Sequence, residues 1–114
     1  MGVGGGEMNL RKFLKFTARK SDYSDMFVTR PRIVCNDGFN ISIQAGYGLY
    51  STPGKDLMDG NYESVEAGYP SEEEPLLMDY AENPSIPTET VYGWVPVEVI
   101  EAVVKKHGGW EVEK

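Results

Sequence analysis

The sequence predicts an α+β fold, in which a small, mainly antiparallel sheet of about four strands is covered by a C-terminal helix and accompanied by an N-terminal basic amphipathic helix. Thirteen glycines and seven prolines in 114 residues indicate many turns and short strands instead of a helical bundle. Two short apolar segments joined by Asp37-Gly38 have the pattern of a β-hairpin. Near the C-terminus, a segment rich in β-branched and aromatic residues runs directly into a helical pattern at Pro96.

The length and composition predict a single domain over residues 9–114. With 40% apolar and 11% aromatic residues, the chain of 114 residues can form one modest core and has no room for a second. The glycine-rich residues 1–8 are expected to be a flexible leader. They lack the regions of a signal peptide, and no apolar run approaches the roughly 18 residues that span a bilayer. We therefore expect a soluble, cytoplasmic protein with no membrane partner.

A basic amphipathic helix is predicted at residues 9–20. Leu10, Phe13 and Leu14 share one face with Thr17 and Ala18. Five basic residues occupy much of the rest of the helix and are candidate nucleic-acid contacts: Arg11, Lys12, Lys15, Arg19 and Lys20. Such a helix can lie on a membrane, bind a partner groove or contact phosphates. Packing of its apolar side on the domain is the favoured interpretation. A short strand is expected at 26–29.

The hairpin is predicted from strands at 33–36 and 39–45 with a two-residue turn at Asp37-Gly38, whose residues tolerate positive φ. Apolar and polar side chains alternate in the second strand: Phe39, Ile41 and Ile43 against Asn40, Ser42 and Gln44. This alternation is typical of a strand with one buried and one solvated face.

Residues 46–61 have no periodicity and four glycines, which predicts a long loop. A surface loop without a specific role is one interpretation. The other is a contact loop that uses Tyr47, Tyr50 and Leu57.

A third strand is predicted at 62–69, with Val65, Ala67 and Tyr69 on one side. Beyond Pro70, the segment 71–74 resembles a capping box that begins at Ser71, so a helical turn is expected before residues 76–78.

The fourth strand is predicted at 90–95 and the covering helix at 96–107. Pro96 suits the first helical position, where its missing N–H is harmless, and Gly108 suits a left-handed C-cap. Four apolar residues of the helix are expected to cover the sheet: Val99, Ile100, Val103 and Val104.

One cysteine and one histidine exclude a disulfide framework, a zinc finger or a Cys-x-x-Cys pair within one chain. Cys35 is interpreted as a buried, inert strand thiol, and His107 as a cation at the negative end of the helix dipole. No P-loop, nucleophile elbow or His-Glu-x-x-His motif is present. We therefore predict no enzyme activity, no cofactor and no metal.

Charge is distributed unevenly along the chain. Residues 1–32 carry a net charge of +4 and residues 33–114 a net charge of −11, for a total of −7. The acidic part disfavours general binding to phosphate backbones. Glu72, Glu73 and Glu74, with nearby Asp79 and Glu82, are interpreted as a solvated acidic patch. The three consecutive glutamates are candidate protein contacts, because an acidic surface can imitate nucleic acid toward a basic partner.

Residues 32–45, 68–72, 80–82, 90–99 and 106–109 form a series of separate blocks. Together these blocks resemble small proteins of tailed phages and prophages that carry no assigned activity. The resemblance covers about residues 32–109, outside the basic helix, and implies a phage origin and a setting in the cytoplasm of the bacterial host. It transfers no functional residues.

Size, acidity and this resemblance together predict a non-catalytic phage accessory protein that binds a host or phage protein. One form of this function is inhibition of host defence, as in anti-CRISPR proteins. Two alternatives are a small structural or assembly component of the phage particle, and nucleic-acid binding through the basic N-terminal helix.

Overall fold

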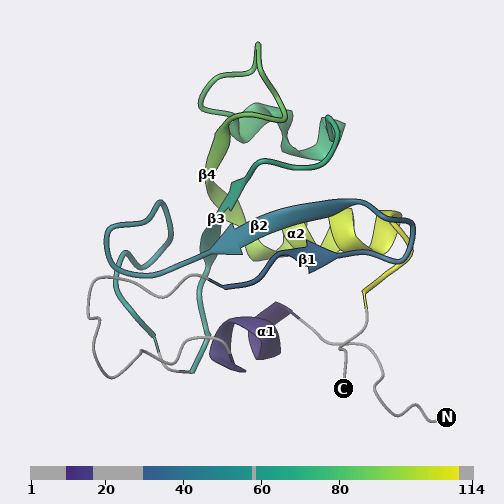
Figure 1. Cartoon of the computed structure of the whole chain (residues 1–114). Helices are drawn as coiled ribbons and strands as arrows, with labels where there is room; N and C mark the ends of the chain where they lie inside the picture. The colour runs from purple at the N-terminus through teal and green to yellow at the C-terminus, as the bar shows by residue number, and fades with distance from the viewer. Residues whose placement is uncertain (1–9, 17–29, 58, 111–114) are drawn as a thin grey trace, which may run out of the picture.

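The computed structural model describes residues 10–16, 30–57 and 59–110. Its helices and strands, in chain order, are α1 (Leu10–Phe16), β1 (Ile33–Val34), β2 (Asn40–Gln44), β3 (Ser64–Gly68), the 3-10 helix η1 (Pro75–Tyr80), β4 (Val91–Pro96) and α2 (Val97–Lys106). The four strands form an antiparallel sheet in the order β1-β2-β3-β4 (Figure 1). The predicted α+β class, with a C-terminal helix against the sheet, is confirmed.

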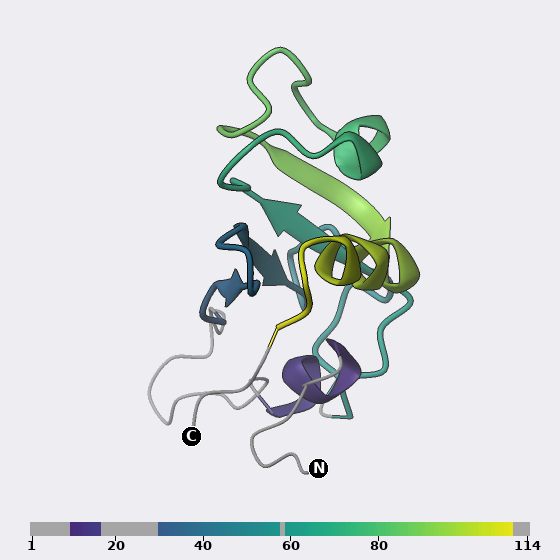
Figure 2. The same ribbon diagram turned by 90° about the vertical axis from the view of Figure 1, so that its right-hand side faces the viewer.

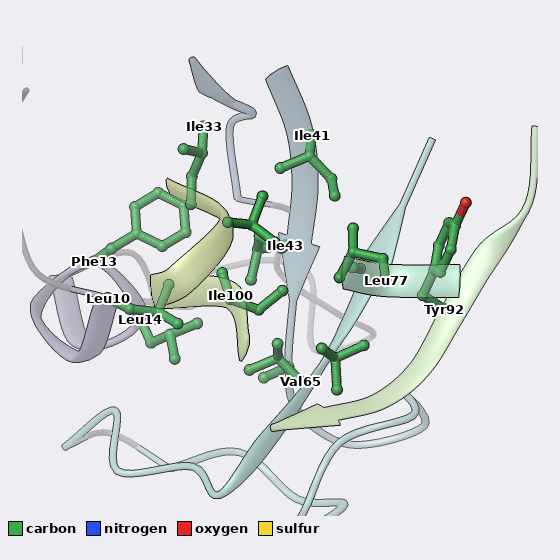
Figure 3. Close-up of a cluster of buried hydrophobic side chains, with 14 of the residues drawn as sticks. Leu10, Phe13, Leu14, Ile33, Ile41, Ile43, Val65, Leu77, Tyr92 and Ile100 are labelled. Atoms are coloured by element: carbon green, nitrogen blue, oxygen red, sulfur yellow. The ribbon is translucent and has the colours of Figure 1, made fainter. Parts of the chain in front are cut away.

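The core lies between one face of the sheet and the helices. In Figure 1, α2 passes behind the sheet, and the turned view of Figure 2 shows α1 below α2. Side chains of Ile43, Ile100 and Leu14 converge from β2, α2 and α1 (Figure 3). Ile100 and Val103 are buried, while Val99 and Val104 pack against the core from its edge. The four residues predicted to cover the sheet therefore do so.

Helix α1 packs on the domain through its apolar side, as favoured above. Leu10, Phe13 and Leu14 are all buried. The ring of Phe13 meets the ring of Trp110 edge to face, with centroids 5.2 Å apart, so a residue just beyond α2 completes this corner of the core. Residues 17–20 of the predicted helix, the leader at 1–8 and the expected strand at 26–29 lie outside the described residues.

The hairpin is confirmed, but the prediction of a two-residue turn is wrong. Ile33 pairs with Ile41 and Val34 with Asn40, which leaves a three-residue loop between Cys35 and Phe39. The Gly38 N–H donates to the Cys35 carbonyl, and Gly38 has a φ of 101°. A turn followed by a left-handed glycine is the usual geometry of a three-residue hairpin loop. Gly38 adopts the left-handed conformation, so Asp37 does not have to.

Strand β3 is shorter than predicted, and two expectations around its end are wrong. Tyr69 does not share the buried side of Val65 and Ala67: it has a φ of 53° and an exposed side chain. Ser71 does not cap η1, because its hydroxyl accepts the Asn40 N–H. The cap is Glu74, whose carboxylate accepts the Leu76 N–H. The chain turns at Tyr69 before the cap forms, which brings Ser71 back to the hairpin.

The junctions of α2 follow the predicted chemistry with a shift of one residue at the start. Pro96 ends β4 and is the N-cap, so Val97, not Pro96, is the first helical residue. At the other end, Gly108 has a φ of 91° and donates to the Lys105 carbonyl, while Gly109 donates to the Val104 carbonyl. This pair of hydrogen bonds is a Schellman motif, which confirms the left-handed glycine cap.

Candidate protein-binding face and buried ion network

His107 lies inside a buried ion network. Its Nδ1 is 2.7 Å from Asp37 Oδ2, and its Nε2 is 2.7 Å from Glu74 Oε1. The imidazole also stacks on Phe39, with ring centroids 4.1 Å apart. The sequence interpretation of His107 as a simple cation at the end of the helix dipole is therefore incomplete, since three distant segments of the chain hold its side chain.

Glu74 is the acidic centre of this network and is only 1% exposed. Its second oxygen, Oε2, accepts hydrogen bonds from Lys106 Nζ at 2.8 Å and from the Leu76 N–H at 3.0 Å. Its prediction as a surface protein contact is wrong, because burial beside two cations makes it a structural anchor. Glu72 and Glu73 are exposed, as predicted.

The electrostatics of the network favour charged side chains throughout. Burial opposes the imidazolium, but hydrogen bonds to Glu74 and Asp37 outweigh it and raise the pKa of His107. Burial likewise opposes the Glu74 carboxylate, yet Lys106, the Leu76 N–H and His107 lower its pKa. Because each ring nitrogen of His107 faces a carboxylate, both must donate, which requires the protonated ring. Such an imidazolium has no lone pair to serve as a base.

Cys35 is buried as predicted, and burial together with the charge of Asp37 raises the pKa of its thiol to about 11. A thiol in this state is a poor nucleophile. Within residues 10–16, 30–57 and 59–110, no three His, Cys, Asp or Glu side chains are grouped to hold a metal ion. No helix in the same part of the chain is long and apolar enough to cross a membrane.

On the surface, Tyr50 and Trp94 form a stacked pair that we call the aromatic ledge. Their ring centroids are 4.6 Å apart and their planes differ by 19°. Tyr50 is 38% exposed and Trp94 is 54% exposed. Exposed aromatic rings held in a fixed arrangement lose little side-chain entropy when a partner covers them, which makes the ledge a candidate contact site.

A β-bulge places Trp94 on the surface. Val65 pairs with Val95 and Ala67 with Tyr92, so two residues of β4 stand opposite Glu66 of β3. Trp94 has a φ of 50°, a left-handed conformation that is rare for a bulky residue. The bulge leaves both neighbours of the Gly93-Trp94 pair, Tyr92 and Val95, in the core while the indole turns outward.

The loop that follows β2 is fastened to this bulge. The Trp94 N–H donates to the Tyr50 carbonyl at 3.0 Å, and the Tyr50 N–H donates to Glu66 Oε1 at 2.9 Å. A Cβ on Gly93 would lie 3.1 Å from the Tyr50 ring, so the absence of a side chain there makes room for the tyrosine. Both backbone and ring contacts therefore fix the ledge.

Beside Trp94 is an open hollow of about 620 Å³. It is lined by Thr52, Tyr62, Glu63, Ser64, Trp94, Pro96, Val97 and Glu98. Two of the lining residues, Glu63 and Glu98, are acidic, and none of the described residues that line the hollow is basic. The ledge and the hollow together form a surface with aromatic and acidic character at the junction of β4 and α2.

The other residues predicted as protein or nucleic-acid contacts differ in their exposure. Tyr47 is 73% exposed, in a turn where its N–H donates to Asp56. Leu57 is half-buried and packs against the core, so only part of its side chain is available to a partner, and its role as a contact stays a prediction. Arg11 and Lys12 are exposed on α1. The side chain of Lys15, and Arg19 and Lys20 entirely, lie outside the described residues.

Sequence reasoning missed Trp94 as a site residue, because strict alternation in the strand places it on the same face as buried Tyr92. The available signal was Gly93, since a glycine inside a strand pattern often marks a bulge. The network of His107 had no comparable signal, because its members are widely separated in the chain.

Comparisons with known proteins provide no relative: no family model, curated protein or solved structure matches this chain.

Proposed function

We propose that this chain is a non-catalytic accessory protein of a tailed phage, which acts in the cytoplasm of the bacterial host by binding a host or phage protein through the aromatic ledge. Inhibition of a host defence system, as by anti-CRISPR proteins, is the form of this function that suits a small acidic binder. The observation that carries the proposal is the exposed Tyr50–Trp94 stack, fixed by a strained bulge.

The energetics of the ledge support a binding role. A non-glycine residue at positive φ costs of order 1–3 kcal/mol, and the core gains nothing from an indole that points outward. Trp and Tyr are the residues most enriched among those that dominate interface energies. An exposed tryptophan in a strained conformation is therefore better explained by a contact than by stability.

The two described side chains with the chemistry of a base or a nucleophile, His107 and Cys35, are both buried. His107 has both ring nitrogens engaged by carboxylates, and Cys35 is a buried thiol with a raised pKa. Neither residue lines the hollow beside Trp94. The exposed aromatic ledge is therefore better suited to recognition than to catalysis.

The test is affinity capture with the tagged protein from lysates of infected and uninfected host cells, followed by quantitative mass spectrometry. Trp94→Ala is compared with the wild type and with Leu76→Ala, which removes an exposed apolar side chain from η1. We expect at least one protein to be recovered by wild type and Leu76→Ala, and about tenfold less by Trp94→Ala.

Circular dichroism and urea unfolding must show that both variants are folded. Equal recovery of every captured protein by Trp94→Ala, or no protein above background in either lysate, would contradict the proposal.

A further inference from the structure

The hollow beside Trp94 has a composition that favours one class of ligand group. Resting on the proposed function, we propose that this hollow receives a lysine or arginine side chain from a basic segment of the partner. The cation would lie against the indole of Trp94 and between the carboxylates of Glu63 and Glu98.

Charge complementarity is the first argument for a cation. Glu63 and Glu98 line the hollow, and no basic residue of the described part of the chain does. The wider segment 55–101 has twelve acidic residues and a single basic one, Lys55. A basic segment that approaches this surface is therefore attracted both by the hollow and by its surroundings.

The start of α2 raises the opposite possibility, because helix N-termini attract anions. The helix contributes the equivalent of roughly +0.5 charge there, whereas the two carboxylates contribute about −2. The Val97 N–H, one of the donors at this terminus, is already engaged by the Glu63 carbonyl at 3.1 Å. The balance favours a cation.

The indole provides the second argument. Tyr50 covers one face of the Trp94 ring, yet the residue is more than half exposed and also lines the hollow. Trp offers the strongest cation–π attraction of the aromatic side chains, and a guanidinium can stack flat on it. Aromatic surface and carboxylates together fit a lysine or arginine better than either does alone.

A stacked aromatic pair can also hold a sugar ring, so the experiment includes that case. The probes are an acetylated, amidated octapeptide of alternating Arg and Gly, the same peptide with citrulline in place of Arg, and maltohexaose. Binding is followed by two-dimensional 1H–15N NMR through the indole N–H of Trp94. The indole of Trp110, which is buried, serves as the internal reference.

We expect the Arg peptide to shift the Trp94 indole resonance and leave that of Trp110 in place. The double variant Glu63→Gln/Glu98→Gln should weaken this binding about fivefold, because two partly exposed ion pairs are lost. The matched control Glu82→Gln/Glu89→Gln removes the same charge from exposed residues that do not line the hollow and should weaken it less than about twofold.

No shift with the Arg peptide, equal binding of the citrulline peptide, equal weakening by the two double variants, or a response to maltohexaose alone would each overturn the proposal. If Trp94-dependent capture from lysate persists in any of these cases, only the assignment of a basic ligand has failed. If capture is also lost, the proposed function has failed with it.

Discussion

At His107 a single imidazole joins three segments of the chain. Asp37 belongs to the hairpin loop, Glu74 is the N-cap of η1, and His107 is the C-cap of α2. Lys106 adds a second cation to the same glutamate. The side chain thus fastens the end of the covering helix to two other parts of the domain.

Replacing His107 by Ala should lower the free energy of unfolding by about 3 kcal/mol, because it leaves a buried carboxylate with one partner fewer. A loss limited to the helix-dipole effect would be no more than roughly 1–2 kcal/mol. Urea unfolding at pH 6 distinguishes the two.

Glu74→Gln should lower the free energy of unfolding more than Asp37→Asn does, because Asp37 is half-exposed and Glu74 is buried. The reverse order would contradict the burial argument.

The same network predicts how stability depends on pH. The pKa of His107 is raised, so its contribution to the free energy of unfolding is complete below the usual pKa of 6.5 and is lost as pH rises through the raised pKa. The pKa values of Glu74 and Asp37 are lowered, so their contributions are complete above 4.5 and are lost as pH falls through the lowered values. The free energy of unfolding should be greatest between about pH 5 and 6.5.

Urea unfolding across this range in wild type and His107→Gln provides the check. The decrease on the alkaline side should be absent from His107→Gln. A decrease of the same size in the variant would assign it to another group.

Helix α2 covers the sheet through a narrow apolar stripe, so position within the helix should decide the effect of a charge. Ile100→Asp places a carboxylate in the core and should cost at least about 5 kcal/mol, comparable to the whole stability of a small domain. Ala102→Asp introduces the same side chain at an exposed position two residues away and should cost less than about 1 kcal/mol. Circular dichroism should show an unfolded Ile100→Asp and a folded Ala102→Asp. Similar unfolding of both would mean that α2 does not pack as described.

The end of α2 depends on a left-handed residue. Gly108→Ala forces a Cβ into a φ of 91° and should lower the free energy of unfolding by about 1–2 kcal/mol. Gly54→Ala is the control, because Gly54 has no positive φ and its nearest neighbour would lie 3.8 Å from the new Cβ. Thermal unfolding of the two variants compares them directly. Equal midpoints would show that the cap conformation carries no cost.

For the molecule as a whole, α1 is part of the core and not a detached basic arm. Phe13→Ala removes the edge contact with Trp110 and should cost about 3–5 kcal/mol. In a Trp94→Phe background Trp110 is the only tryptophan, so its emission can be followed alone when the excitation wavelength is too long for tyrosine. That emission should shift to longer wavelength in the Phe13→Ala variant. Unchanged emission and stability would mean that α1 is dispensable.

This packing also determines how nucleic-acid binding by α1 should be tested. Deletion of residues 1–20 would remove Leu10, Phe13 and Leu14 from the core, so a loss of binding could reflect unfolding. Arg11→Gln with Lys12→Gln changes exposed side chains instead. If α1 contacts phosphates, this double variant should bind more weakly and with a smaller dependence on salt.

The fold was largely predictable because its signals are local. Neighbouring residues are enough to identify these elements: alternation in residues 39–43 identifies β2, the apolar stripe around Ile100 identifies α2, and the glycine at 108 identifies its end. The errors also have local causes. The Asp37-Gly38 pair fits both two- and three-residue loops. The pattern at Ser71 fits a capping box, but η1 begins only at Pro75, so its N-cap is Glu74 and not Ser71.

By itself the sequence determined the class of fold, the approximate positions of the four sheet strands and α2, and the buried faces of β2 and α2, since periodicity and turn chemistry act between near neighbours. Only the tertiary structure decided which acidic residues are structural and which aromatic residues are exposed. Glu74 is buried because it meets His107, 33 residues away. Trp94 is exposed because pairing with β3 requires a bulge at Gly93-Trp94. Such outcomes depend on contacts between distant segments, which no local pattern specifies.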